Sequence, residues 1–363
     1  MKKNKNYVDL KDQPVPEGQH LLEVDDLKMY FHTEDGVVRA VDGVSYTLDR
    51  GETLGVVGES GSGKSVTAMT IMGLISMPPG KIEGGDVRYR GRSILEMTEE
   101  EMQHIRGNDI AMIFQDPMTS LNPVYMIGKQ VGEGLRLHRG YSKQEALKRA
   151  TELLDLVGIP EPEKRVNEYP HQFSGGMRQR VMIAMALACD PDILIADEPT
   201  TALDVTIQAQ IIELMQEMQE KNGNAIIMIT HDLGVVADMA DKIMVMYAGR
   251  PVEFGTAEEI FYESRHPYTW GLIRSIPEQA IDEKKPLTPI HGNPPSLMNL
   301  PEGCVFSPRC PYATDKCRKQ RPERVVTESG HYSACHYSGD PEFLKNAPET
   351  SRTRMDSKKG GEA

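Results

Sequence analysis

The chain has 363 residues, of which 39% are hydrophobic and 26% are charged, and its formal net charge is -13. This composition is typical of a globular protein, and no run approaches the ~20 apolar residues that a membrane helix needs. The acidic balance argues against general binding to nucleic acid phosphates. The N-terminal stretch lacks the apolar core of a signal peptide, which predicts a cytoplasmic protein that reaches a membrane only through partner proteins.

Residues 1–20 are polar and predict a flexible segment. From residue 21 onward, short apolar strands alternate with helices, a pattern that predicts a mainly parallel sheet. A helix is expected to begin at Ser142, because Glu145 completes a capping box there. Another is expected from about residue 205 to 218, with a stop at Asn222-Gly223. The strands are expected at 54–57, 193–196, 225–229 and 243–246, where each run is apolar on both faces.

Beyond about residue 262 the alternation of strands and helices ends and proline becomes frequent. Four of the five cysteines also lie in this part of the chain. We therefore predict a large domain at 21–262 and a small cysteine-containing domain at 263–338. The last residues, 339–363, are polar and mixed in charge, and they predict a disordered tail.

The segment GESGSGKS at 58–65 matches the phosphate-loop pattern G-x-x-x-x-G-K-[ST]. It follows a predicted strand, and a helical run begins near Lys64, so the surrounding structure is also the expected one. Glycines let backbone N–H groups turn toward phosphate oxygens, and a helix N-terminus favours an anion. Lys64 would supply a cation to the outer phosphates and Ser65 a hydroxyl ligand to Mg²⁺. The predicted phosphate-binding residues are Gly58, Ser60, Gly61, Ser62, Gly63, Lys64 and Ser65.

The apolar strand predicted at 193–196 ends in two adjacent acids, Asp197 and Glu198. In open parallel sheets, ligands bind at the carboxyl ends of the strands. Asp197 is placed to hold Mg²⁺, and Glu198 points to the other side of the strand, where it could polarise an attacking water. His231 follows the strand predicted at 225–229 and is expected at the same edge of the sheet.

These motifs occur in a fixed order along the chain: the phosphate loop, IFQDP at 113–117, SGGMRQR at 174–180, ILIADEPT at 193–200, ALD at 202–204, and His231. In this order they resemble the ATP-binding-cassette (ABC) ATPase family over about 21–260. The resemblance implies an α/β fold of the P-loop NTPase type that binds and hydrolyses ATP with Mg²⁺. It also implies a RecA-like core, an antiparallel β-subdomain near 21–100 and a helical subdomain at about 117–173.

The resemblance assigns a role to each matching position within one cassette. Gln115 is the glutamine that senses Mg²⁺ and contacts the membrane subunits, Glu198 is the general base, and His231 contacts the γ-phosphate. Phe31 falls where the family places an aromatic side chain that stacks on adenine, and its neighbour Tyr30 is the alternative.

Two further motifs are expected to act between cassettes. Ser174, Gly175 and Gly176 resemble the family signature, which binds the γ-phosphate of ATP held by the opposite subunit. Asp204 resembles the aspartate that couples the two sites. Met177 follows Gly176, whereas the commonest signature ends in Gly-Gly-Gln; the peptide-transporter branch often has this version, and we expect activity to be intact.

The segments HPYT at 266–269 and GNPPSLMNLPEGCVFSPRCPYATDKC at 292–317 resemble the C-terminal extension of oligopeptide and dipeptide import ATPases. The implied partners are a second ABC ATPase chain, expected to be a paralogue in a head-to-tail dimer, and two membrane permease subunits. An extracytoplasmic substrate-binding protein takes part indirectly, no nucleic acid is expected, and the chain would lie at the cytoplasmic face of the inner membrane. The alternative is a soluble ABC ATPase that acts on DNA or ribosomes. The short stretch between Lys64 and Ser174 and the single cassette argue against it.

Cys304, Cys310, Cys317 and Cys335 cluster in a proline-rich region with little apolar sequence. A metal centre is favoured over disulfides, because the compartment is reducing, and over four free thiols. Zinc sites use paired C-x₂₋₄-C knuckles, which are missing from this sequence, whereas four cysteines also suit an iron–sulfur cluster. Some peptide-import ATPases with this extension carry a [4Fe–4S] cluster, and these positions resemble its ligands. Zinc remains the alternative, and His336 is a further candidate ligand.

Overall fold

The computed structural model describes residues 10–116, 120–200, 205–276 and 290–348, and two β-sheets organise them. The smaller sheet is antiparallel, with the strand order β2-β1-β4-β5. Its strands are β1 (Leu22–Thr33), β2 (Gly36–Leu48), β4 (Gly80–Tyr89) and β5 (Arg92–Ser93). This sheet confirms the antiparallel subdomain predicted near 21–100.

The larger sheet has the strand order β11-β12-β10-β9-β3-β8-β7-β6, and its strands from β9 to β6 run parallel. Parallel pairing brings the carboxyl ends of β3, β7 and β8 to one edge. The four buried strands predicted from sequence match β3, β7, β8 and β9 to within a residue. The strands are β3 (Thr53–Val57), β6 (Ile110–Ile113), β7 (Ile193–Asp197), β8 (Ala225–Thr230), β9 (Lys242–Tyr247), β10 (Arg250–Thr256), β11 (Val325–Val326) and β12 (Tyr332–Ser333).

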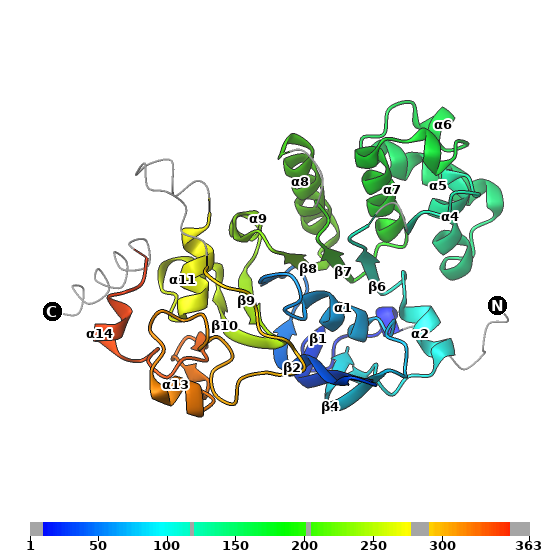
Figure 1. Cartoon of the computed structure of the whole chain (residues 1–363). Coiled ribbons are helices and arrows are strands. Elements are labelled where there is room, and N and C mark those ends of the chain that lie inside the picture. Colours follow the sequence, from blue (N-terminus) through cyan, green and yellow to red (C-terminus); the bar gives the residue numbers. More distant parts are fainter. Residues whose placement is uncertain (1–9, 117–119, 201–204, 277–289, 349–363) are drawn as a thin grey trace.

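A group of helices stands at one end of the molecule, at the upper right of Figure 1. In α5, the Ser142 hydroxyl accepts a hydrogen bond from the Glu145 N–H at 3.3 Å, and the Glu145 carboxylate accepts one from the Ser142 N–H at 2.8 Å. This is the predicted capping box. The group comprises α4 (Ile127–His138), α5 (Lys143–Leu156), α6 (Pro162–Arg165), the 3₁₀ helix η2 (Pro170–Gln172) and α7 (Gly175–Leu187).

The remaining helices lie against the sheets and in the C-terminal region. α8 ends where Gly223 adopts a φ of 66°, at the predicted Asn222-Gly223 stop. Among the described residues, no helix is both long and apolar enough to cross a membrane. These elements are η1 (Leu10–Asp12), α1 (Lys64–Ile71), α2 (Glu99–Ile105), α8 (Val205–Asn222), α9 (Leu233–Ala237), α10 (Ala257–Tyr262), α11 (Pro267–Arg274), α13 (Asp315–Lys319) and α14 (Pro341–Leu344).

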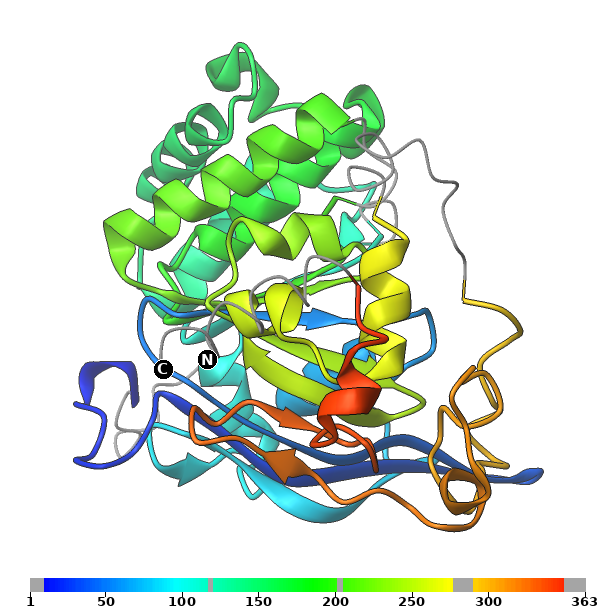
Figure 2. The ribbon, with the colours of Figure 1, turned by 90° about the vertical axis from the view of Figure 1, so that its left-hand side faces the viewer.

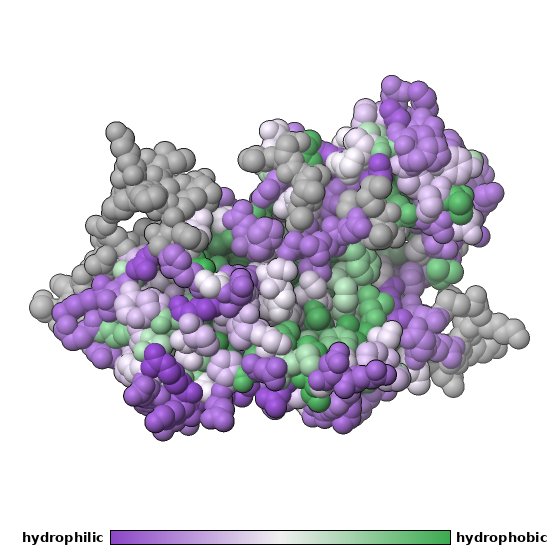
Figure 3. Space-filling model, viewed as in Figure 1, coloured by the Kyte–Doolittle hydropathy of each residue, from purple (hydrophilic) through white to green (hydrophobic). Residues whose placement is uncertain are grey.

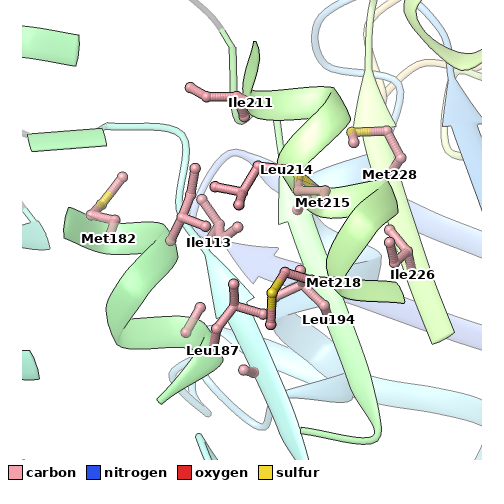
Figure 4. Close-up of a cluster of buried hydrophobic side chains, with 14 of the residues drawn as sticks. Ile113, Met182, Leu187, Leu194, Ile211, Leu214, Met215, Met218, Ile226 and Met228 are labelled. Carbon is pink, nitrogen blue, oxygen red and sulfur yellow. The ribbon is translucent and has the colours of Figure 1, made fainter. Parts of the chain in front are cut away.

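Buried side chains cover both faces of the larger sheet, because successive strand residues point to opposite faces. On β7, Leu194 packs into one hydrophobic cluster, whereas Ile193 and Ile195 pack into a second cluster shared with the smaller sheet. Figure 4 shows the first cluster, in which side chains from α7 and α8 meet those of β6, β7 and β8. Burial on both faces explains why these strands are apolar throughout.

The region after residue 262 packs onto the same sheet and core. β12 pairs with β10 and so extends the larger sheet, which places the orange strands of Figure 2 beside the lime ones. Tyr268 and Phe306 belong to the same hydrophobic cluster as Leu194. Figure 3 shows a largely hydrophilic surface over this region, at its lower left. The domain boundary near 262 stays a prediction, since the sheet and the core both continue across it.

Both chain ends depart from the expected disorder over part of their length. Within the segment predicted as flexible, Leu10 is buried and the Lys11 Nζ donates to the Cys189 carbonyl oxygen at 3.0 Å. Within the predicted disordered tail, α14 forms and Phe343 packs against Trp270, with 5.3 Å between ring centroids. Residues 10–12 and 341–344 thus form ordered elements, the first held by the buried Leu10 and the second by the contact of Phe343 with Trp270, and this departs from the flexibility and disorder predicted for the two segments. Residues 1–9 and 349–363 lie outside the described residues.

Candidate functional site

The phosphate loop connects β3 to α1, and two of its three glycines, Gly58 and Gly63, occupy positions where a larger residue would not fit. Gly58 and Gly63 have φ angles of 152° and 101°. A Cβ atom on Gly58 would lie 2.2 Å from the Met246 carbonyl oxygen, and one on Gly63 would lie 2.3 Å from that of Ala40. The loop is thus packed tightly against the strands beneath it, while Ser60 is exposed on its outer side.

One side chain of the loop points to a ligand. Ser62 is 3% exposed, and its hydroxyl oxygen has no hydrogen-bond partner among the described residues. Buried hydroxyl groups are usually hydrogen-bonded, so the absence of a partner inside a phosphate loop calls for an explanation. A phosphate oxygen bound in the loop would supply the missing acceptor.

Lys64 and Ser65 form the first turn of α1 and face the loop and the end of β7. The Lys64 Nζ donates to the carbonyl oxygens of Gly58 and Glu59, at 2.7 and 3.0 Å. Burial lowers the pKa of Lys64, and the neighbouring carboxylates partly oppose that shift. The amine therefore lies at the phosphate loop, held by backbone oxygens that a phosphate group could replace.

Two of the three predicted Mg²⁺ ligands, Ser65 and Asp197, are in contact at the edge of the sheet, whereas the third, Gln115, contacts Glu198. The Ser65 hydroxyl donates to Oδ1 of Asp197 at 2.9 Å, and Asp197 is 2% exposed. Burial raises the pKa of Asp197, while the hydrogen bond from Ser65 opposes the shift. A hydroxyl and a carboxylate are hard oxygen donors, and this pair fits a Mg²⁺ ion that keeps several of its waters.

Glu198 lies beside the other two predicted catalytic residues. The Gln115 Nε2 donates to one Glu198 carboxylate oxygen at 3.0 Å, and the His231 Nδ1 lies 3.4 Å from the other. Glu198 has a φ of 46°, and its backbone N–H donates to the Ile229 carbonyl oxygen at 2.8 Å. This left-handed conformation is uncommon for a residue other than glycine, and such conformations concentrate at functional sites.

The signature residues lie on the helical group rather than in the phosphate loop. Ser174 caps α7, and its hydroxyl accepts from the Met177 N–H at 3.3 Å. The buried Gln179 on the same helix donates to the Pro199 carbonyl oxygen at 2.6 Å, which ties α7 to the chain just after Glu198. The other residue predicted to act between cassettes, Asp204, lies outside the described residues.

The two candidate adenine-stacking residues are neighbours on β1. Phe31 is half-buried and pairs in register with Val38 of β2. The Tyr30 hydroxyl donates to the Asp42 carboxylate at 2.9 Å, so that side chain already has a partner. The assignment of Phe31 to adenine stays a prediction.

The four clustered cysteines line one small cavity, together with His336. All four are free thiols, and burial raises the pKa of Cys310 to about 11 and that of Cys335 to about 12. The His336 Nε2 lies 2.9 Å from the Gln320 carbonyl oxygen. Across the described residues, no three His, Cys, Asp or Glu side chains are arranged to hold a metal ion. The four cysteines therefore lie together, as a common ligand set requires, but the described residues show no metal site, and the metal centre stays a prediction.

Sequence reasoning missed an ion pair that joins the cysteine region to the phosphate loop. Arg309, next to Cys310, contacts both carboxylate oxygens of Glu59, at 2.5 and 3.0 Å. Glu59 occupies a variable position of the phosphate-loop pattern, and Arg309 lies far along the chain, so no local spacing connects them. The only signal in the sequence was a single arginine in the proline-rich stretch 292–310.

The structure is that of an ATPase of the ABC class. It combines a parallel sheet and a phosphate loop with the Ser65–Asp197 pair, and Glu198 lies between Gln115 and His231. The chain matches the family described as ABC transporter over residues 41–201, and the family described as oligopeptide/dipeptide transporter, C-terminal region, over residues 252–317. The chain belongs to the family of oligopeptide and dipeptide transport ATP-binding proteins. These matches confirm the predicted fold class, the ATP-hydrolysing activity and the family resemblance.

Relatives with established names agree along most of their length. The chain is 58% identical to the oligopeptide transport ATP-binding protein OppD of Bacillus subtilis, over 86% of this chain and 87% of the relative. It is 52% identical to the dipeptide transport ATP-binding protein DppD of Escherichia coli, over 88% and 97%. The solved dimeric structure of the cassette MJ0796 bound to ADP and Pi aligns with a TM-score of 0.59 and 29% identity, covering 65% of this chain and 98% of that chain.

Proposed function

We propose that this chain powers the import of oligopeptides or dipeptides by hydrolysing ATP beneath a pair of membrane permeases. The observation that carries the proposal is the identity with peptide-transport ATPases over nearly their whole length, which extends through the C-terminal region as well as the cassette. The chain would sit at the cytoplasmic face of the membrane as a peripheral subunit. A separate binding protein would deliver the peptide outside the cell.

The site residues divide the chemistry among themselves in this proposal. Ser65 and Asp197 hold Mg²⁺, which would neutralise charge on the outer phosphates of ATP. Glu198 orients the attacking water and accepts its proton, in the manner of a general base. Gln115 and His231 bracket Glu198 and relay the state of the γ-phosphate to the rest of the chain.

A second cassette completes each site. Ser174, Gly175 and Gly176 of one chain bind the γ-phosphate held by the phosphate loop of the other, because the start of α7 is an anion-binding helix terminus. Asp204 couples the two sites, and Phe31 stacks on adenine. The related cassette MJ0796 has been solved as a dimer, which supports a paired arrangement. Closing and reopening of the pair would move the permeases between inward-facing and outward-facing states.

The test is purification of the native complex and identification of its subunits. We expect two permeases and a second, paralogous ATPase chain, together with ATPase activity that rises when the loaded binding protein is added. The complex carrying Ser174→Arg should lose activity although each phosphate loop is intact. Co-purification with ribosomes instead of permeases would favour the soluble alternative.

We further propose that the cysteine-lined cavity binds a [4Fe–4S] cluster of structural role. Its support is the convergence of four free thiols on one cavity. One zinc ion needs four ligands within about 2.3 Å of a common point, whereas a cluster accepts thiolates spread around a larger core. Cys304, Cys310, Cys317 and Cys335 would be the ligands, and zinc is the competing occupant. Protein purified without oxygen should be brown, with about four irons per chain.

A further inference from the structure

We propose that Arg309 is a positioning residue of the ATP site, which acts through Glu59 to hold the phosphate loop in its binding shape. Arg309 lies in the C-terminal region beyond α11, far from every cassette motif in sequence. Its side chain is 4% exposed, and its guanidinium group contacts Glu59, the second residue of the phosphate loop. The inference concerns ATP binding and does not depend on what occupies the cysteine-lined cavity.

All three nitrogen atoms of the Arg309 guanidinium group have hydrogen-bond acceptors. The Nη1 and Nη2 atoms donate to the two Glu59 carboxylate oxygens, at 2.5 and 3.0 Å. The Nε donates to the His291 carbonyl oxygen at 3.0 Å, and Nη2 also donates to that of Ile290 at 3.1 Å. The Nη1 lies within 3.3 Å of the Tyr247 hydroxyl. A lysine has three donors on one atom and cannot reproduce this planar fork, so the geometry requires arginine.

Glu59 connects Arg309 to Lys64, the predicted phosphate-binding lysine. Its backbone N–H donates to the Tyr268 hydroxyl at 2.8 Å, and its carbonyl oxygen accepts from the Lys64 Nζ at 3.0 Å. Arg309 therefore holds the side chain of Glu59, and Tyr268 holds its backbone. Glu59 in turn contacts Lys64. A loop fixed before the ligand arrives loses less conformational entropy on binding.

The anchoring residues are themselves held rigidly. The Tyr268 ring lies 4.6 Å from that of Tyr247 and 5.4 Å from that of Phe306, measured between centroids. Tyr268 and Phe306 are almost completely buried. The C-terminal region also contacts the smaller sheet, where the Arg39 N–H on β2 donates to the Leu297 carbonyl oxygen at 3.2 Å. The segment from residue 290 to residue 309 thus contacts both the β1–β2 hairpin and the phosphate loop.

The test compares Arg309→Gln with Arg318→Gln in the full chain, alone and in its complex. Each arginine is next to a cysteine of the cavity, but Arg318 pairs with Asp315 at the surface, where its side chain is 59% exposed. We expect Arg309→Gln to weaken MgATP binding and raise KM by about tenfold, equivalent to about 1.4 kcal/mol, while kcat at saturating ATP changes less than about twofold. Arg318→Gln should leave both parameters unchanged. Arg309→Lys should recover little of the loss.

A double-substitution cycle separates positioning from general damage to the fold. Glu59→Gln should also raise KM. The double variant, Glu59→Gln with Arg309→Gln, should have a KM no higher than that of the more impaired single variant, because both substitutions remove the same contact. Tyr268→Phe keeps the ring packing but removes the acceptor of the Glu59 N–H, and it should raise KM as well. Equal KM values for Arg309→Gln and Arg318→Gln, or strictly additive losses in the cycle, would overturn the proposal. A thermal melt of each variant identifies any that fails to fold, and Tyr268→Phe then carries the test.

Discussion

The nucleotide site and the cysteine-lined cavity differ in how their polar groups are satisfied without a ligand. In the nucleotide site, Lys64, Ser65 and Glu198 all contact protein atoms of the same site. In the cavity, burial raises the pKa of Cys310 and Cys335, because a thiolate there would be poorly solvated. Lys64, Ser65 and Glu198 thus already have partners in the protein, whereas burial favours the neutral thiols in the cavity. Substitutions should accordingly affect turnover at the first site and stability at the second.

The largest effect is expected from Glu198→Gln. The amide keeps the size of the side chain and its hydrogen bond with Gln115, but it cannot accept a proton from water. We expect ATP to bind and turnover to fall by about 10²-fold or more, the usual scale for a lost general base. Steady-state phosphate release measures turnover, and size-exclusion chromatography should detect an ATP-bound closed dimer. Activity close to that of the unchanged chain would remove Glu198 from this role.

Next in size is Lys64→Ala, which removes the cation that faces the outer phosphates. A charged hydrogen bond contributes roughly 1.5–3 kcal/mol, so MgATP affinity should fall by about 10- to 100-fold. Lys81→Ala is the matched control, since Lys81 is 62% exposed and pairs with Glu83 on the smaller sheet. Titration with a fluorescent ATP analogue gives both affinities. Unchanged binding by Lys64→Ala would mean that the loop does not hold phosphate as we describe.

A different kind of effect is expected from Cys310→Ser. With the proposed cluster bound in the cavity, the variant should lose iron and brown colour, and its melting temperature should fall by roughly 5 °C because cluster binding no longer adds stability. MgATP affinity should stay within about threefold. Cys189→Ser provides the control, because Cys189 is buried elsewhere, under the helical group. A colourless parent protein with one equivalent of zinc would decide for zinc, and metal retained by Cys310→Ser would exclude this thiol as a ligand.

The smallest effect is expected from His336→Ala. His336 lines the cavity, but its Nε2 is engaged with the backbone at Gln320. We therefore expect iron content and ATP turnover to stay unchanged, as measured by elemental analysis and by phosphate release. A clear loss of iron would place His336 among the ligands, and the site would then be a mixed one rather than a thiol site.

The sequence was sufficient where a feature depends on neighbouring residues. The strand ends that carry Asp197 and His231 were predictable because buried parallel strands are apolar throughout and ligands bind at their carboxyl ends. The phosphate loop was predictable because its residues form one contiguous pattern, G-x-x-x-x-G-K-[ST], between a strand and a helix.

Features that depend on distant partners could not be predicted in this way. Lys11 is fixed by the carbonyl oxygen of Cys189, and Phe343 by the ring of Trp270. Neither segment has an apolar period of its own, so the first was expected to be flexible and the second disordered. The pairing of Arg309 with Glu59 likewise arises from tertiary packing of the C-terminal region on the phosphate loop, and no short motif encodes it.

The pairing of β12 with β10 has a consequence for solubility. Glu253 and Phe254 of β10 pair with Ser333 and Tyr332, and the Ala334 N–H donates to the Val252 carbonyl oxygen at 2.8 Å. A chain shortened to residues 21–262 would leave β10 as an open edge of the larger sheet. Open strand edges are templates for pairing with other chains, and native proteins usually cover them. The shortened cassette should therefore self-associate and sediment at concentrations where the full chain stays dispersed.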